Sequence, residues 1–156
     1  MIAVLQRVNN ASVQVSGEVV GSCGAGLCIL LGVAEDDCEQ DAEALAEKIA
    51  GLRIFSDDQG KMNLSLLDVS GEMLVVSNFT LLAAYRKGKR PDYTRAAPPE
   101  KANALYEYFC LLCRNKGIKV EQGVFGAHME VIISGDGPVT ISMDSKVLLA
   151  SKKVGG

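Results

Sequence analysis

The residue types best suited to chemistry gather in two short stretches. The first, "VVSNFTL" (75–81), ends an apolar run with hydroxyl and carboxamide side chains, those of Ser77, Asn78 and Thr80. Such groups at the end of a buried strand either line a pocket or cap a turn, and the sequence leaves both interpretations open. The second stretch, "GDGPVTI" (135–141), places a Gly-Pro pair inside a segment that otherwise has the pattern of a strand. The pair is therefore either a turn or part of a site.

The pair Gly137-Pro138 offers main chain rather than side chain to a ligand. Glycine has no Cβ and proline has no backbone N–H, so this stretch of backbone can press closely on a ligand without leaving a donor unsatisfied. Such contact discriminates by exclusion, because a substituent on one side of a stereocentre collides and one on the other side does not. Most X–Pro bonds are trans, so composition alone predicts no cis bond here.

A third stretch concentrates positive charge. Five of the eleven residues in "YRKGKRPDYTR" (85–95) are Lys or Arg, in a chain whose net charge is −3. Tyr85 and Tyr93 flank this cluster and add aromatic surface. We predict that the stretch contacts phosphate groups, with a solvated loop as the alternative. The candidate phosphate ligands are Arg86, Lys87, Lys89 and Arg90.

Other reactive residue types form no recognisable site. His128 is the only histidine, and no nucleophile is spaced to pair with it in a Ser-His-Asp arrangement. Cys110 and Cys113 lie late in a predicted helix with no second pair, which favours buried thiols over zinc ligands. No phosphate-binding or dinucleotide-binding glycine fingerprint is present. We therefore expect no metal and no cofactor.

Length and composition predict one globular domain. At 156 residues, with 48% hydrophobic and 22% charged residues, the chain can bury a full core. The five cysteines follow no secretory signal, and the longest apolar run, "CGAGLCILLGVA" (23–34), is too short to span a bilayer. We expect a soluble cytoplasmic protein with no membrane or DNA partner.

The elements that must position these residues follow from periodicity. Apolar residues recur every three or four positions in 36–51 and 98–117, which predicts two amphipathic helices. Ser16-Gly17 predicts a hairpin turn. We predict one mixed α/β domain with more strand than helix. The expected strands are 1–8, 12–20, 27–33, 52–55, 72–83, 118–124, 128–134 and 139–143.

Taken together, the start "MIAVLQRV", the middle "RIFSDDQGKMN" and the two motif stretches resemble the D-aminoacyl-tRNA deacylases. The family's motifs have the forms SQ-x-T-L and N-x-G-P-[VF]-T, and the spacing between them matches here. The resemblance covers residues 1–143 and implies a deacylase-like α/β fold with a β-rich, barrel-like core and two main helices. It leaves 144–156 as a C-terminal tail, expected to be either disordered or packed on a neighbouring subunit.

The resemblance also implies an activity. Members of the family are cytosolic homodimers that hydrolyse the ester between a D-amino acid, or glycine, and the terminal ribose of tRNA, as chiral proofreading in translation. Gly137-Pro138 would be cis and would enter the partner's active site to reject L-aminoacyl esters. By position, the pocket beside the ester would be formed by Ser77, Asn78, Phe79 and Thr80, with Phe125 and Met129 at its flank and Gln6 and Arg7 close by.

Two residues depart from the family pattern. Asn78 stands where the family usually has Gln, and Gly135 where it usually has Asn. A shorter side chain and a missing carboxamide could alter pocket geometry, which keeps two alternatives open. They are a non-catalytic dimeric tRNA-binding module and a deacylase of altered aminoacyl specificity.

The resemblance leaves the mechanism to the residues. An unassisted hydroxyl such as that of Thr80 is a weak nucleophile, and no base is visible near it in the sequence. We therefore expect main-chain stabilisation around Phe79 and Thr80, with help from the tRNA's own 2′-hydroxyl.

Overall fold

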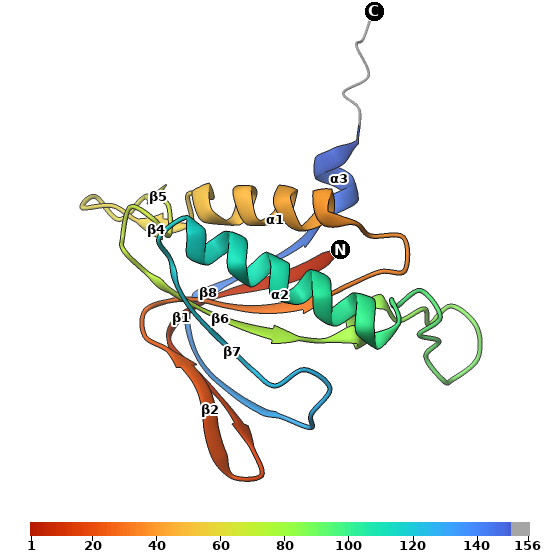
Figure 1. Ribbon diagram of the computed structural model, residues 1–156. Helices are drawn as coiled ribbons and strands as arrows, with labels where there is room; N and C mark the ends of the chain where they lie inside the picture. The colour runs from red at the N-terminus through yellow and green to blue at the C-terminus, as the bar shows by residue number, and fades with distance from the viewer. Residues whose placement is uncertain (151–156) are drawn as a thin grey trace, which may run out of the picture.

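A bent β-sheet covered on one face by two helices forms the body of the protein, which a computed structural model describes over residues 1–150 (Figure 1). The sheet order is β2-β1-β3-β6-β7, and β8 pairs with the other edge of β1. The strands are β1 (Ile2–Val15), β2 (Glu18–Cys23), β3 (Gly26–Gly32), β4 (Phe55–Ser56), β5 (Met62–Leu64), β6 (Glu72–Ser77), β7 (Lys119–Gln122) and β8 (Glu130–Asp144). The helices are α1 (Glu39–Gly51), the 3-10 helix η1 (Phe79–Leu82), α2 (Pro99–Asn115) and α3 (Ser145–Leu149).

The long strand β1 organises the sheet. Its first half pairs with β3, its second half pairs with β2, and β8 runs antiparallel along its opposite edge. The predicted turn at Ser16-Gly17 is confirmed: both residues have positive φ, 51° and 80°, as a two-residue hairpin turn of the primed type requires.

The sheet curls until β2 and β7 almost meet, which confirms the predicted barrel-like core. Ser22 of β2 donates its backbone N–H to the Glu121 carboxylate of β7, over 3.0 Å. Next to it, Gly21 lies so close to β7 that a Cβ would stand 2.4 Å from the Gln122 carbonyl oxygen. Glycine is required at this close approach.

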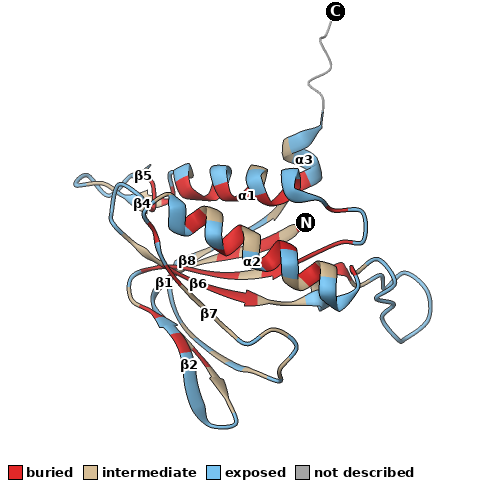
Figure 2. Cartoon of the chain, in the orientation of Figure 1, coloured by how far each residue is buried: buried red, intermediate tan, exposed pale blue. Residues whose placement is uncertain are grey.

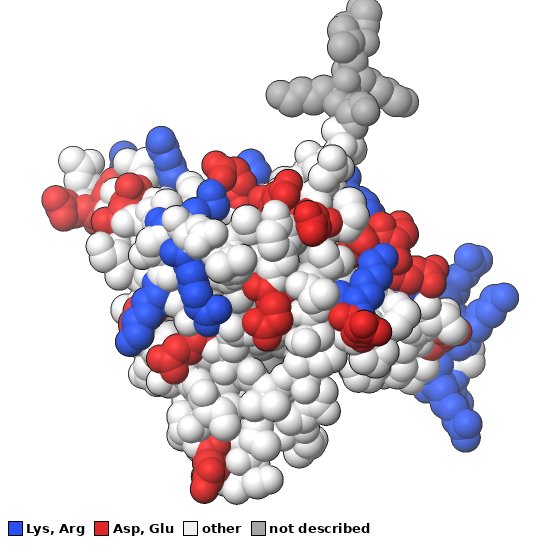
Figure 3. Space-filling view, in the orientation of Figure 1, with Lys and Arg blue, Asp and Glu red and all other residues white. Residues whose placement is uncertain are grey.

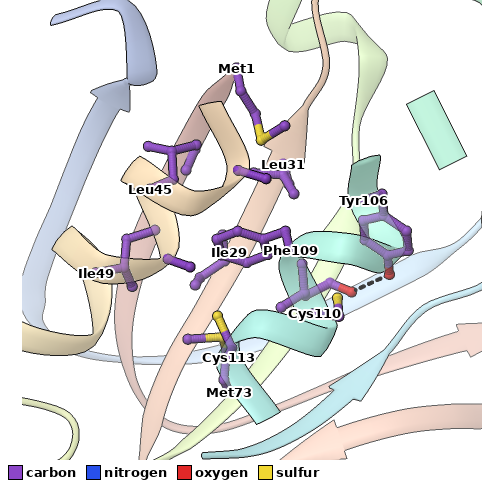
Figure 4. Packing of buried hydrophobic residues seen from close by; sticks show 14 of the residues in the cluster. Met1, Ile29, Leu31, Leu45, Ile49, Met73, Tyr106, Phe109, Cys110 and Cys113 are labelled. Atoms are coloured by element: carbon purple, nitrogen blue, oxygen red, sulfur yellow. Dashed lines mark hydrogen bonds between the residues drawn. The ribbon is translucent and has the colours of Figure 1, made fainter. Parts of the chain in front are cut away.

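Two separate cores result from this curl. A small cluster that includes Val8, Val13 and Leu74 fills the barrel-like half of the sheet. A larger cluster lies between the sheet and the two main helices, and it includes Leu45 of α1 and Phe109 of α2 (Figures 2 and 4). The helices thus bury the faces that their periodicity predicted.

The two cysteines of α2, Cys110 and Cys113, are free thiols buried in the larger core, as the sequence predicted. Burial raises the pKa of the Cys110 and Cys113 thiols to about 12, so both are protonated near neutral pH. Within residues 1–150, no group of three or more His, Cys, Asp or Glu is positioned to hold a metal ion. None of the helices in this part of the chain combines the length and apolarity that a membrane crossing needs.

The predicted strand at 52–55 is wrong over most of its length. The Ile54 N–H donates to the carbonyl of Leu52, 3.1 Å away, so the chain turns back on itself after α1. Ile54 is buried in the helix-side core from this turn, and only Phe55 and Ser56 pair, with β5. An apolar triplet can be buried from a turn as well as from a strand, and the sequence pattern does not distinguish the two.

The last two predicted strands are one. β8 runs through Gly137-Pro138, whose peptide bond is cis. Val8 pairs with Gly135 and Gln6 with Thr140, so the four residues 136–139 stand opposite Arg7 alone. The extra residues leave the ladder as a large bulge in β8, and β1, which is continuous, pairs with β8 on both sides of it. We call residues 136–139 the tip.

The predicted tail begins inside the fold. Ser145, the first residue of α3, is fully buried; its hydroxyl donates to the Asp41 carboxylate over 2.6 Å and accepts from the Met1 ammonium over 2.8 Å. That ammonium also pairs with buried Asp37 at 2.7 Å, and Lys146 lies 2.9 Å from Asp41. The fold therefore continues to residue 149, while 151–156 lie outside the described residues.

This buried charge cluster predicts acid sensitivity. Burial alone would raise the pKa of Asp41, but hydrogen bonds from Ser145, the Cys38 N–H and Lys146 outweigh it and hold that pKa well below its ordinary value. A depressed carboxylate pKa stabilises the fold above the unfolded-state pKa of about 3.9, and the contribution is lost as pH falls through the folded-state pKa.

We expect Ser145→Ala to lower the free energy of unfolding by about 1–3 kcal/mol at pH 7, because it leaves buried charges short of a partner. The difference from the wild type should shrink at pH 3, because below the unfolded-state pKa of about 3.9 the wild type begins to lose its own Asp41 contribution. Urea unfolding at both pH values measures this. Ser142→Ala, which changes an exposed serine of β8, is the control. A difference that grows at low pH would contradict the assignment.

Candidate functional site

A pocket of about 900 Å³ opens at the ends of β3 and β6, against the start of α2. Its wall is mostly aliphatic and aromatic, which suits a ligand with apolar surface. Six of the residues predicted for the site line it. They are Ser77, Asn78, Phe79, Thr80, Phe125 and Met129.

Asn78 determines how the chain leaves β6. Its N–H donates to the Leu31 carbonyl of β3 at 2.8 Å, which ends the strand. Its side-chain oxygen accepts from both the Thr80 N–H, at 3.2 Å, and the Thr80 hydroxyl. Asn78 is thus the N-cap of η1 and also lines the pocket, so both interpretations of this stretch apply.

The hydrogen bonds of η1 limit which groups can act on a ligand. The Thr80 hydroxyl donates to Asn78, an amide oxygen that cannot serve as a base. The Phe79 N–H, at the first position of η1, has no acceptor within residues 1–150. A free N–H at the end of a helix is suited to stabilising a developing negative charge.

Gly32, which sequence analysis did not single out, allows η1 to lie against the end of β3. A Cβ on Gly32 would stand 2.9 Å from the Asn78 carbonyl oxygen and 2.6 Å from a methyl carbon of Leu82. Only glycine permits this approach of the pocket wall to the sheet. No sequence signal distinguishes Gly32 from the other glycines, because the contact is made with a segment 46 or more residues away.

Aromatic residues close the pocket on its other sides. Tyr106 of α2 donates its hydroxyl to the Val75 carbonyl of β6 over 2.7 Å (Figure 4). Its ring lies 6.1 Å from that of Phe125. Tyr93 lines the mouth. His128 also lines the pocket, although its sequence context had connected it to no site.

The other predicted substrate-binding residues lie together outside the pocket. Gly137 and Pro138 belong to the tip, and Gln6 and Arg7 lie beside it on β1. Arg7 donates from Nε to the Asp136 carbonyl at 3.1 Å, pairs with the Asp136 carboxylate at 3.2 Å, and donates from Nη1 to the Ile54 carbonyl at 2.8 Å. Gln6 approaches Thr140 on the far side of the bulge, at 3.5 Å. Gly137 and Pro138 are exposed, and none of these four predicted residues lines the pocket of the same chain. β1 thus braces both ends of the tip.

The tip requires one glycine and tolerates another. Gly137 has a φ of 139°, and a Cβ there would stand 2.6 Å from the Val139 backbone nitrogen. Gly135, the departure from the family pattern, has no heavy atom within 4 Å of a Cβ. There is therefore room for a side chain at position 135, although this chain has none. The contacts that hold the tip come from Arg7.

The basic stretch forms an exposed loop on the same side as the pocket mouth. Backbone hydrogen bonds in both directions between Ala84 and Asp92, at 2.7 and 2.8 Å, close it at its base. Its Lys and Arg side chains project from the molecule where the chain connects η1 to α2 (Figures 1 and 3). Within residues 1–150, no ion pair or hydrogen bond engages the side chains of Arg86, Lys87, Lys89 or Arg90.

Known proteins with this sequence pattern cover nearly the whole chain. A family model described as D-Tyr-tRNA(Tyr) deacylase matches residues 4–144. A D-aminoacyl-tRNA deacylase of Thermosipho africanus is 57% identical over 146 residues, covering 94% of this chain and 98% of that protein. One from Dehalococcoides mccartyi strain BAV1 is 60% identical, covering 94% of this chain and 95% of that protein.

Solved structures have the same fold. A c-Myc DNA Unwinding Element Binding Protein superposes with a TM-score of 0.86 at 42% identity, covering 92% of this chain and 98% of that one. A probable eukaryotic D-amino acid tRNA deacylase superposes with a TM-score of 0.80 at 17% identity, with the same coverage. The match over residues 4–144 and the identity above 55% to curated relatives establish that this chain belongs to the D-aminoacyl-tRNA deacylases, a family of hydrolases.

Proposed function

We propose that the protein hydrolyses the ester bond of D-aminoacyl-tRNA and of glycyl-tRNA formed on non-cognate tRNA, releasing the free amino acid and the tRNA. The observation that carries the proposal is the convergence of Ser77–Thr80, Phe125 and Met129 on one pocket with a free N–H at its edge. Family membership supplies the substrate class.

The proposed chemistry needs little from the protein, because an aminoacyl ester is already activated. Water adds to the ester carbonyl carbon, and the bond between that carbon and the ribose oxygen breaks. The ribose oxygen takes a proton from the attacking water, which leaves the free amino acid and the tRNA hydroxyl. The Phe79 N–H stabilises the oxyanion, and the 2′-hydroxyl of the terminal ribose assists in positioning the water. Thr80 is not the nucleophile in this scheme, since its hydroxyl lacks a base.

Chiral selection is assigned to the tip of a second subunit. In a homodimer, Gly137 and Pro138 of one subunit would enter the pocket of the other and press backbone against the Cα substituent of the amino acid. An L side chain would collide, whereas hydrogen or a D side chain would not. The exposed position of the tip, away from the pocket of its own chain, supports this arrangement.

The experiment is to follow ester loss from D-Tyr-tRNA, L-Tyr-tRNA and Gly-tRNA with the purified full chain. We expect cleavage of the D and glycyl esters only. Binding of tRNA without cleavage would favour the non-catalytic tRNA-binding module. Cleavage of the L ester would favour a deacylase of altered specificity and overturn the role of the tip.

The role of Thr80 is tested by Thr80→Ala. We expect the variant to keep D-Tyr-tRNA deacylation within about tenfold of the wild type, because the hydroxyl only supports the η1 cap. Single-turnover rates measure this. A loss of about 10⁴-fold or more, or trapping of an acyl-enzyme in the wild type, would instead indicate covalent catalysis.

Gly32→Ala should disturb the pocket wall without removing any of its groups. The added methyl group must push η1 away from β3, so we expect roughly tenfold slower deacylation and a Tm lower by several degrees. Gly51→Ala, at the exposed end of α1 with no heavy atom within 4 Å of the new Cβ, is the matched control. Equal rates for the two variants would contradict the positioning role of Gly32.

A further inference from the structure

The exposed aromatic rings of the protein are all in one region. Of the eight Phe and Tyr residues, all within residues 1–150, only Phe79, Tyr85 and Tyr93 are exposed, with 58%, 83% and 38% of their surface accessible. The other five are buried or half-buried. All three exposed rings belong to the 15-residue segment that runs from the pocket edge into the basic loop. Exposed aromatic rings in a cluster indicate a binding surface.

Two of these rings form a shelf at the pocket mouth. Phe79 and Tyr93 both line the pocket, and their ring centroids are 5.1 Å apart in an edge-to-face arrangement. In an edge-to-face pair one ring directs its edge at one face of the other ring, so the ring faces outside that contact stay open to a ligand. We call this pair the aromatic shelf.

Hydrogen bonds order the backbone on both sides of Tyr93. Tyr93 directly follows the Ala84–Asp92 hydrogen bonds that close the basic loop, and Thr94 N–H donates to the Asp92 carboxylate at 2.7 Å. On the other side, the Tyr93 carbonyl accepts from the Ala96 N–H at 3.0 Å. The backbone that carries the Tyr93 ring is therefore ordered before a ligand arrives, which lowers the entropy lost when a ligand stacks on the ring.

The shelf lies between two sites with complementary roles. On one side is the pocket proposed to hold the ester-bearing terminal nucleoside. On the other side are the four Lys and Arg side chains of the loop, which no ion pair or hydrogen bond engages within residues 1–150. An aromatic surface next to a track of positive charge is the pattern by which proteins bind single-stranded nucleic acid, with bases on rings and phosphates on Lys and Arg.

We propose that the aromatic shelf stacks an unpaired base of the nucleotides that immediately precede the terminal nucleoside, so that the single-stranded 3′ end of the tRNA passes from the loop over Phe79 and Tyr93 into the pocket. This inference rests on the proposed function for the direction of the strand. It adds a nucleotide-binding subsite outside the reacting centre, with Tyr85 as a further ring along the same path.

The test compares a substrate that contains the preceding nucleotides, within a whole tRNA, with one that consists of the terminal nucleoside ester alone. D-Tyr-tRNA has them, and the D-tyrosyl ester of adenosine does not. Loss of one stacked base corresponds to roughly 5-fold to 150-fold in affinity. We expect Tyr93→Leu to raise KM for D-Tyr-tRNA at least fivefold more than for the adenosine ester, and Tyr93→Phe to restore the wild-type ratio. Tyr108→Leu, at a half-buried tyrosine that bonds Glu43 of α1, is the control.

A direct binding measurement separates this inference from the activity. The probe is an unpaired oligoribonucleotide with 2-aminopurine next to its 3′-terminal nucleoside, whose fluorescence is quenched when the base stacks. Quenching by the wild type and by Tyr93→Phe, but not by Tyr93→Leu, supports the shelf even if neither ester is cleaved. Equal KM increases for both substrates, or quenching that survives Tyr93→Leu, overturns it.

Discussion

Gly137→Ala should lower D-Tyr-tRNA deacylation by roughly 100-fold, because the tip has no room for a Cβ. The new methyl carbon would stand 2.6 Å from the Val139 nitrogen, at a φ of 139° that residues with side chains rarely adopt. The tip must therefore move, and a displacement of about 1 Å in a positioning group can cost about this factor in rate. Rates on D-Tyr-tRNA and L-Tyr-tRNA under single-turnover conditions measure the effect.

The control for this change is Gly135→Ala. It adds the same methyl group two residues earlier, where a Cβ meets no heavy atom within 4 Å. We expect wild-type rates and an unchanged Tm from this variant, since Gly135 is exposed and the added methyl group displaces no neighbouring atom. Wild-type activity and selectivity in Gly137→Ala would remove the tip from the mechanism.

Replacing Arg86, Lys87, Lys89 and Arg90 by Gln should weaken tRNA binding by on the order of 100-fold at low salt. Each phosphate contact that is lost reduces the slope of log affinity against log salt by about 0.7 to 0.9, so four contacts reduce it by about 3. The side chains are exposed and unpaired within residues 1–150, so their removal should leave Tm unchanged. Filter binding of uncharged tRNA from 50 to 300 mM salt, on the order of physiological values, covers the range.

A pair of double variants separates local contact from net charge. One double variant is in the loop and combines Lys87→Gln with Lys89→Gln. The other combines Lys48→Gln, on α1, with Lys61→Gln, beside β5, and changes the net charge by the same amount. Only the loop pair should change the salt slope. Equal slopes would mean that the loop is solvated and that tRNA is held elsewhere.

Local signals were sufficient to predict the helices and the hairpin. The three-to-four-residue spacing around Leu45 and Phe109 is repeated over several turns, and Pro99 marks a helix start that the structure has at the same residue. Ser16 and Gly17 both have the positive φ angles that a two-residue hairpin turn of the primed type requires. Each of these elements is determined by residues close together in the chain, so the sequence pattern is informative.

Contacts between distant segments could not be predicted in this way. The near-closure of the sheet depends on Gly21 meeting Gln122, and the continuity of β8 depends on β1 as its partner. The helix α3 is only five residues long and is held by its buried Ser145 rather than by its own propensity. A Gly-Pro pair breaks an isolated strand, so the sequence predicted two strands where the structure has one.

The part of the candidate site that could be predicted is the part whose residues are adjacent in the chain. Ser77–Thr80 form one continuous turn, and the resemblance to the family brought Phe125 and Met129 to it. Gly32 was missed as a site residue because its partner, η1, is distant in the chain. Tyr93 was predicted only as aromatic surface beside the basic cluster, because its contact with the Phe79 ring is made across a loop. His128 was missed because a histidine without a nearby nucleophile gives no signal of pocket lining.

The bulge opposite Arg7 makes the tip part of the sheet rather than part of a loop. Its conformational entropy is therefore lost when the chain folds, not when a substrate arrives. A stereochemical filter of this kind can be stiff without weakening affinity for the accepted substrate. In its proposed role the tip would also make selectivity depend on strand register, so that mutations in β1 or β8 outside the pocket lining that shift the ladder would change which amino acids are excluded.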